Sequence, residues 1–125
     1  MLEKRNFYIN GSWVAPKKSS DIEVINPATE KACAVVSLGS KDDINDAVLS
    51  AKEAFKTWGY STREDRIALL ETFYTLYKKR WNDITDAIIQ EMGAPRDFAS
   101  KLQTGTGASH TLSLIHISEP TRPLY

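Results

Sequence analysis

The strongest constraint on the fold is a long amphipathic run in the middle of the chain. Between residues 62 and 92, apolar side chains recur at alternating steps of three and four, the spacing of one face of an α-helix. They are Ile67, Leu70, Tyr74, Tyr77, Trp81, Ile84 and Ile88. Because Asn82 and Asp83 can cap a new helix inside this run, the pattern predicts two helices, residues 62–80 and 83–92, joined by a tight bend.

Capping residues mark the ends of the predicted helices. Ser61-Thr62-Arg63-Glu64 has the pattern of a capping box, in which the serine hydroxyl and the glutamate carboxylate bind amides left free at a helix start. Gly93 is a stop signal at the far end. Ser40 predicts the start of an earlier helix that ends at Gly59. Its apolar side chains are expected to form one buried stripe, made of Ile44, Ala47, Val48, Ala51, Ala54, Phe55 and Trp58.

Two β-hairpins are predicted before these helices. Residues 7–9 and 13–14 are short apolar runs joined by Asn10-Gly11, whose residues tolerate the positive φ angles of a tight turn. Residues 21–25 alternate apolar and acidic side chains, and an extended run over residues 32–38 follows a turn at Asn26-Pro27. A weaker helical pattern begins at Arg96. The fold class predicted for this chain is therefore α+β, with two N-terminal β-hairpins followed by three or four amphipathic helices.

Composition excludes several classes of protein. Sixteen basic residues balance sixteen acidic ones and no basic patch stands out, so we expect no nucleic-acid partner. No run approaches the roughly eighteen apolar residues of a membrane span, and the N-terminus lacks the apolar core of a signal peptide. The single cysteine cannot form an internal disulfide, which agrees with a reducing compartment. We expect a cytoplasmic protein that binds no membrane.

No catalytic constellation emerges from the residues themselves. Cys33 lies between two alanines in a strand pattern with no histidine near it in sequence, which favours a structural thiol over a nucleophile. The segment "QTGTGASH" has His110 where a dinucleotide-binding loop needs its third glycine, so Gly105 and Gly107 are interpreted as positions where a helix packs closely or ends. His110 and His116 lack the spacing of metal ligands.

Several strings, taken in order, resemble one family. "FYINGSWV", "INPATE", "AFKTW", "REDRIALL" and "EMGAP" occur in the order and spacing of the N-terminal segment of an NAD(P)-dependent aldehyde dehydrogenase. The resemblance implies an α/β parent enzyme with a Rossmann-like cofactor domain, a catalytic domain and an oligomerisation arm, assembled as a homodimer or homotetramer. Residues 1–111 would be an incomplete N-terminal part of the cofactor-binding domain.

The resemblance also implies the chemistry of the parent enzyme. A cysteine thiolate attacks the aldehyde to give a thiohemiacetal, hydride passes to NAD or NADP, and water hydrolyses the resulting thioester to a carboxylic acid. In that family the residues for these steps lie further along the chain than Tyr125. None is assigned here, so we expect this chain alone to be inactive and to bind no cofactor. The alternative is a short, non-catalytic helical interaction module derived from the family.

One site can be carried over from the resemblance. Some members of the family bind a monovalent cation through backbone carbonyls near the "INP" turn and through an acidic residue two positions before the glycine of a "TGKP"-like motif. The matching positions are the carbonyls of Val24 and Ile25 and the carboxylate of Glu91. We therefore predict a monovalent-cation site at these three residues.

The C-terminal residues differ in character from the rest. "LSLIHISEPTR", residues 112–122, alternates at first like a strand and resembles the translation of a transposase-based sequencing adapter. We therefore expect residues 112–125 to be a non-native tail and the family sequence to end at Thr111. A reading frame that continues to a cysteine nucleophile would support the enzyme interpretation, and a true stop codon would support the interaction module.

Overall fold

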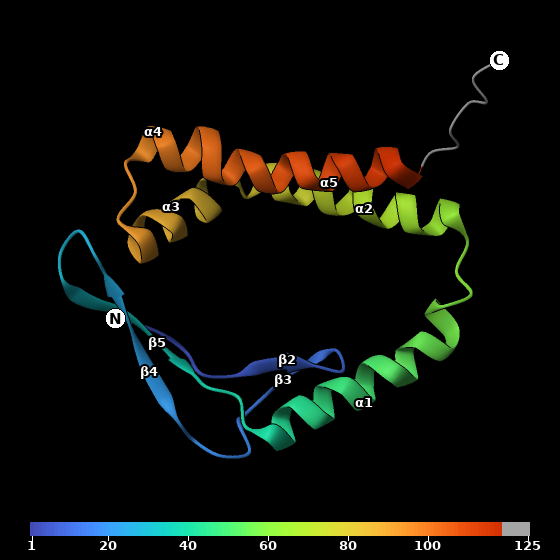
Figure 1. The fold of residues 1–125 in the computed structure, drawn as a ribbon, viewed down its shortest axis with the longest axis horizontal. Coiled ribbons are helices and arrows are strands. Elements are labelled where there is room, and N and C mark those ends of the chain that lie inside the picture. Colours follow the sequence, from blue (N-terminus) through green and yellow to red (C-terminus); the bar gives the residue numbers. More distant parts are fainter. Residues whose placement is uncertain (119–125) are drawn as a thin grey trace. The chain divides into compact units, whose positions relative to one another are not determined.

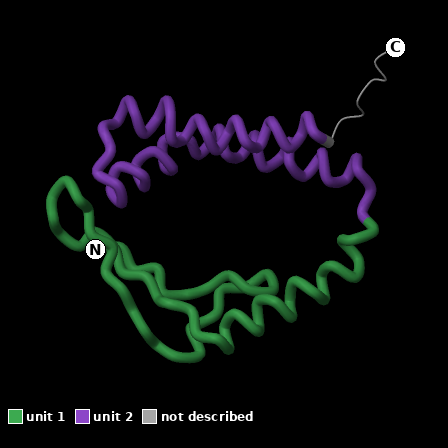
Figure 2. Tube along the Cα trace, in the orientation of Figure 1, with its two compact units in different colours: residues 1–60 green, residues 61–125 purple. Residues whose placement is uncertain are grey.

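The computed structural model describes residues 1–118, which fall into two compact units. Unit 1 is Met1–Tyr60 and unit 2 is Ser61–Tyr125, described as far as residue 118. Figure 2 shows the two units in different colours. The strands and one long helix belong to unit 1, and the remaining helices belong to unit 2 (Figure 1).

The first predicted hairpin is confirmed. Strand β2 (Phe7–Ile9) pairs antiparallel with β3 (Ser12–Val14), and Phe7 lies opposite Val14. Asn10 and Gly11 form the turn with φ angles of 52° and 76°. Positive φ at both central residues matches the right-handed twist of the two strands, which is why this dipeptide closes a hairpin.

The second predicted hairpin is also confirmed, and a third strand joins it. Strand β4 (Asp21–Asn26) pairs antiparallel with β5 (Lys31–Ser37), and β1 (Leu2–Lys4) adds to the other edge of β5 in parallel. The order is β1-β5-β4, and Ala34 and Val35 of the central strand are buried. Strand β1 was not predicted, because only one of its three residues is apolar and no alternation marks it.

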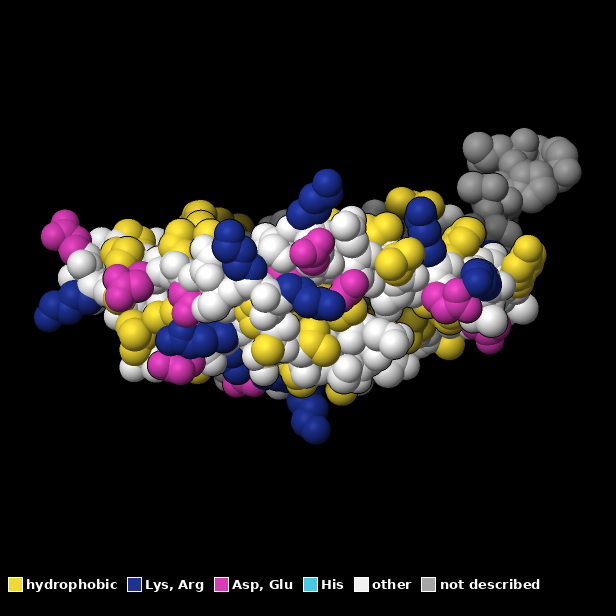
Figure 3. Space-filling model, turned by 90° about the horizontal axis from the view of Figure 1, so that it is seen from below, with side chains coloured by type: hydrophobic (Ala, Val, Ile, Leu, Met, Phe, Trp, Pro, Cys, Tyr) yellow, Lys and Arg dark blue, Asp and Glu magenta, His cyan; other side chains and the backbone are white. Residues whose placement is uncertain are grey.

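Helix α1 (Lys41–Trp58) has the predicted ends, with Ser40 as N-cap and Gly59 as C-cap. Its predicted buried stripe is wrong for this chain, because the only buried residue of α1 is Asp43. The large apolar side chains of the stripe are exposed, with Phe55 at 69%. Within unit 1 the two small sheets offer no surface that covers this face. Figure 3 shows hydrophobic side chains at the surface of the protein, interspersed with charged ones.

Unit 2 contains the predicted helical run with small changes at its ends. The elements are α2 (Arg63–Lys79), α3 (Trp81–Met92), α4 (Arg96–Phe98), a π-helix η1 (Ala99–Thr104) and α5 (Gly105–Ser118). The capping box is formed by Thr62 and Asp65 rather than by Ser61 and Glu64. Both tetrapeptides fit the pattern, and the Ser61 hydroxyl instead accepts a hydrogen bond from Arg66 Nε at 2.8 Å.

Helix α3 begins two residues earlier than predicted. It starts at Trp81 without a side-chain cap, so the predicted cap at Asn82 and Asp83 is wrong. Asp83 instead accepts a hydrogen bond from Arg80 Nε at 3.2 Å, which uses its carboxylate outside a capping role. Gly93 ends the helix in the left-handed conformation, as predicted.

The core of unit 2 forms where α5 packs on α2 and where η1 packs on α3. Ala99, Thr104, Ala108, Thr111 and Ile115 are buried there. The strand-like alternation after Thr111 does not form a strand, because α5 continues as a helix through Ser118. Residues 119–125 of the predicted tail lie outside the described residues. Within residues 1–118, no helix is both long enough and apolar enough to cross a membrane.

Candidate functional site

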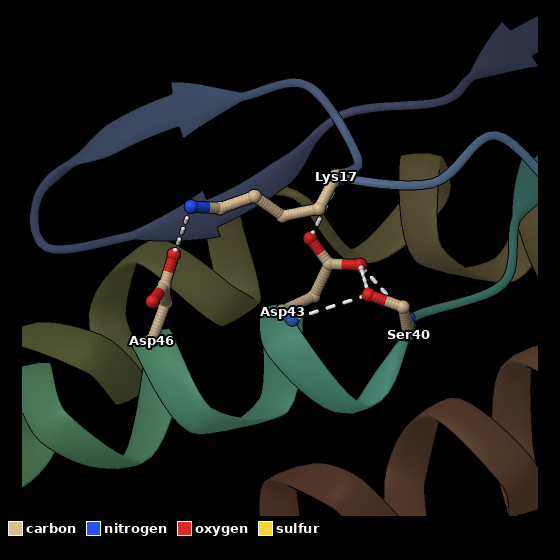
Figure 4. A network of polar contacts seen from close by, with 4 residues as sticks. All are labelled: Lys17, Ser40, Asp43 and Asp46. Atoms are coloured by element: carbon tan, nitrogen blue, oxygen red, sulfur yellow. Dashed lines mark hydrogen bonds and ion pairs between the residues drawn. The ribbon is translucent and has the colours of Figure 1, made fainter.

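The densest polar network in unit 1 joins the segment after the first hairpin to the start of α1 (Figure 4). Asp43 Oδ1 accepts a hydrogen bond from the Lys17 backbone amide at 2.9 Å. Asp43 Oδ2 accepts hydrogen bonds from the Ser40 amide at 2.8 Å and from the Ser40 hydroxyl at 2.6 Å. Lys17 Nζ lies 2.9 Å from a carboxylate oxygen of Asp46. The Asp43 carboxylate therefore joins the start of α1 to a backbone amide 26 residues earlier in the sequence.

These contacts determine what the network can do chemically. The Ser40 hydroxyl, followed by the Lys17 and Ser40 amides, lowers the pKa of Asp43, because all three donors favour the ionised carboxylate. The hydrogen bond to Asp46 raises the pKa of Lys17. Asp43 is buried, ionised at neutral pH and bonded through both oxygens, so it is unsuited to transfer a proton. The network is a structural joint.

A cavity of about 460 Å³ lies beside this joint, between the first hairpin and α1. Its charged side chains, Lys17, Asp43 and Asp46, are the members of the network and already contact one another. No cysteine or histidine lines it. The cavity therefore brings no catalytic group to the site.

The glycine-rich segment of unit 2 packs two helices closely together. A Cβ at Gly107 would lie well inside van der Waals distance of the Tyr77 hydroxyl. That hydroxyl donates a hydrogen bond to the Thr104 carbonyl at 3.0 Å, and the hydroxyls of Thr104 and Thr85 are 2.9 Å apart in the buried interior. The close-packing interpretation of this segment is confirmed, since Gly105 and Gly107 lie inside helix α5 rather than in a phosphate-binding loop.

No pattern in the sequence predicts the π-helix η1, where the backbone forms wider turns just before Gly105. Trp81 Nε1 of α3 donates a hydrogen bond to Ser100 Oγ of η1 at 3.0 Å. π-Helical turns often occur at functional sites in other proteins. Here the wider turns bring Ser100 and Thr104 to polar partners on α3, Trp81 and Thr85, so they serve packing.

Cys33 has the structural role that its sequence context predicts. Its side chain is half-buried on β5, and Sγ donates a hydrogen bond to the Val24 carbonyl of β4 at 3.3 Å. The two histidines, His110 and His116, lie exposed on α5. Among residues 1–118, no group of three or more His, Cys, Asp or Glu side chains could hold a metal ion.

The three residues of the predicted monovalent-cation site belong to different units. Val24 and Ile25 lie on β4 of unit 1, on either side of a register shift in the ladder with β5. Glu91 is exposed near the end of α3 in unit 2, two residues before Gly93. The Val24 carbonyl already accepts the Cys33 hydrogen bond, although a carbonyl oxygen has a second lone pair. The cation site stays a prediction.

Comparison with known proteins identifies the family to which this combination of strands and helices belongs. The sequence profile of the aldehyde dehydrogenase family matches residues 13–115. The chain belongs to the aldehyde dehydrogenase family. A curated relative, 3-succinoylsemialdehyde-pyridine dehydrogenase of a Pseudomonas species, is 40% identical over 118 residues, which cover 94% of this chain and 25% of the relative. The chain thus spans about a quarter of the length of the curated relatives it matches.

Solved structures of aldehyde dehydrogenases contain the same fold. The crystal structure of an aldehyde dehydrogenase from Bartonella henselae matches with a TM-score of 0.92 and 46% identity, over 94% of this chain and 25% of that one. Aldehyde dehydrogenase C from Pseudomonas syringae, in complex with NAD+ and octanal, matches with a TM-score of 0.90 and 34% identity, over 94% of this chain and 24% of that one. The arrangement of strands and helices described above is therefore that of part of the aldehyde dehydrogenase fold.

Proposed function

We propose that this chain is the N-terminal part of the cofactor-binding domain of an aldehyde dehydrogenase. The whole subunit would oxidise an aldehyde to a carboxylic acid with NAD+ or NADP+, through a thiohemiacetal on a catalytic cysteine. The observation that carries the proposal is the family match over residues 13–115, together with a 34% identical relative whose structure holds NAD+ and octanal. The homodimer or homotetramer expected of the parent belongs to the same proposal.

The residues of this chain would supply scaffold rather than chemistry. Asp43 and Ser40 fix the start of α1, and Tyr77 and Gly107 fix the distance between α2 and α5. The Cys33 thiol donates a hydrogen bond to the Val24 carbonyl between β5 and β4, which is a contact within the sheet. The 125-residue chain alone would therefore be inactive.

We also propose that residues 112–125 are not native to this enzyme. The support is the match between residues 112–122 and a translated sequencing adapter. Helix α5 continues into this segment through Ser118, where Ile115 is buried and Leu112, three residues earlier, is half-buried. A helix accepts any sequence with apolar residues at this spacing, whatever its origin.

Reading the gene with a long-read method and assaying the encoded protein tests both proposals. The expected result is an open frame that departs from the adapter codons after Thr111 and reaches a cysteine nucleophile. The purified full-length protein should then reduce NAD+ or NADP+ with at least one aldehyde of a panel, while the 125-residue chain shows no activity. A reproducible stop codon after the same fourteen residues, 112–125, would contradict both proposals and support the interaction module.

A further inference from the structure

The tip of the first hairpin presents an asparagine followed by a glycine. Asn10 and Gly11 are both exposed, and a Cβ on Gly11 would meet no atom within 4 Å. Of the asparagines of this chain, Asn10 is the only one that a glycine follows. Within residues 1–118, no hydrogen bond engages the Asn10 side-chain amide or the Gly11 backbone amide. Both groups are therefore open to reaction with each other.

The reaction between these two groups is the loss of the side-chain amide as ammonia. The Gly11 nitrogen gives its proton to hydroxide and attacks the side-chain carbonyl carbon of Asn10. The bond from that carbon to the side-chain nitrogen breaks, and the nitrogen takes a proton from water and leaves as ammonia. Water then opens the resulting five-membered succinimide at either carbonyl, which gives aspartate or isoaspartate. Glycine favours the attack, because it has no side chain to hinder it.

Closing the succinimide ring rotates the peptide between Asn10 and Gly11, so the turn has to open locally. In the closed turn both residues have positive φ, and the strands on either side are only three residues long. An exposed tip between such short strands opens at a small part of the free energy of global unfolding. We propose that Asn10 is a site of spontaneous deamidation in the folded chain.

The two products affect unit 1 differently. Asn10 lines the cavity of about 460 Å³ beside the joint, where Lys17 is the only cation among the described lining residues and Asp43 and Asp46 are already present. Aspartate at position 10 adds a third carboxylate to this lining. Isoaspartate also adds a carboxylate, and it inserts one more carbon into the backbone of the turn. Because only a two-residue turn with positive φ matches the twist of the strands, isoaspartate separates β2 from β3.

The test incubates the 125-residue chain in mildly alkaline buffer at physiological temperature and follows the mass of its tryptic peptide 6–17, with a sample digested at time zero as background. This peptide contains Asn6 and Asn10, and its fragmentation assigns the change in mass to one of them. Asn6 is the matched control, because it is also exposed but precedes Phe7 instead of a glycine. We expect Asn10 to react at least about tenfold faster than Asn6, and within about tenfold of its own rate in the urea-unfolded chain.

The effect on the hairpin has a separate readout. Tyr8 and Trp13 are paired in the register of β2 and β3, and their ring centroids lie 5.2 Å apart, so NMR contacts between the two rings report the paired strands. The purified isoaspartate product should lose these contacts, whereas the variant Asn10→Asp, which adds the charge without lengthening the backbone, should keep them. Reaction of Asn10 no faster than Asn6, reaction only in the urea-unfolded chain, or ring contacts that persist in the isoaspartate product would each overturn the inference.

Discussion

The hydroxyl of Tyr77 on α2 occupies the space into which a Cβ on Gly107 of α5 would project, so a methyl group there would have no room. The same hydroxyl donates a hydrogen bond to the Thr104 carbonyl at 3.0 Å. The hydrogen bond to Thr104 therefore positions the Tyr77 side chain, and the missing side chain of Gly107 leaves the space that it occupies. The close contact of the two helices at this point requires a glycine at position 107.

Replacing Gly107 with alanine should destabilise unit 2. Alanine is a better helix former than glycine by about 1 kcal/mol, but forcing a methyl group into a packed contact costs about 1–3 kcal/mol, so we expect a net loss of up to about 2 kcal/mol. Chemical denaturation of the chain measures it. Gly105→Ala is the control, since its Cβ would be 3.9 Å from Trp81, an ordinary contact, and it should leave stability unchanged or raise it. Equal effects at the two glycines would contradict the steric argument.

Ser40→Ala should destabilise α1 by about 1 kcal/mol, the usual cost of losing an N-cap side chain. The Ser40 hydroxyl accepts from the Asp43 amide at 3.3 Å and donates to the Asp43 carboxylate, so the substitution removes half of a capping box. Amide hydrogen exchange in the first turn of α1 reports the change. Thr57→Ala, near the other end of α1, is the matched control. Its hydroxyl bonds only a carbonyl within the helix, and exchange in the first turn should stay as in the wild type.

The joint around Asp43 should also make unit 1 sensitive to acid. Hydrogen bonds hold the pKa of Asp43 below its ordinary value of 3.8, so its contribution to stability is fully present above that value and is lost as the pH falls through the lowered folded pKa. The free energy of unfolding, measured by denaturation at a series of pH values, should therefore fall more steeply with decreasing pH below about pH 4. Asp43→Asn should flatten this dependence in signals from unit 1. In the same variant, the unfolding signal of unit 2 should keep its dependence on pH, because hydrogen bonds from Thr62 lower the pKa of Asp65 in that unit.

Structural features of this chain were predictable from the sequence where they depend on interactions between residues close together in sequence. Asn10-Gly11 and Ser40 were predicted correctly because each acts on backbone within a few residues. The bond from Lys17 to Asp43 and the pairing of β1 with β5 were missed, since each joins segments far apart in sequence and leaves no local periodicity. The stripe of α1 was predicted correctly as apolar but wrongly as buried. An apolar periodicity shows which face of a helix is suited to packing, and it does not show whether this chain supplies a surface that packs on that face.

Ile115 should contribute to stability even though it lies in the segment proposed to be non-native. It is only 7% exposed, on the side of α5 that faces the core of unit 2, and removing a buried isoleucine side chain to alanine costs about 2–5 kcal/mol. We expect the low end of this range near the helix end. Ile117, which is 76% exposed, provides the control, and Ile117→Ala should have little effect. Thermal melts of the two variants compare them directly, and equal melting temperatures would mean that this part of α5 does not pack on α2.

Cys33→Ser in the full-length enzyme should leave aldehyde oxidation intact. The Cys33 thiol spans β4 and β5 by donating to the Val24 carbonyl at 3.3 Å, and serine can donate to the same oxygen, so the strand pair keeps its contact. A catalytic nucleophile behaves differently, because replacing its sulfur removes the covalent intermediate and lowers kcat by orders of magnitude. We therefore expect kcat/KM of the Cys33→Ser variant within about twofold of the wild type. Steady-state reduction of NAD+ measures this value, and a collapse of kcat with the folded structure preserved would place Cys33 in the chemistry after all.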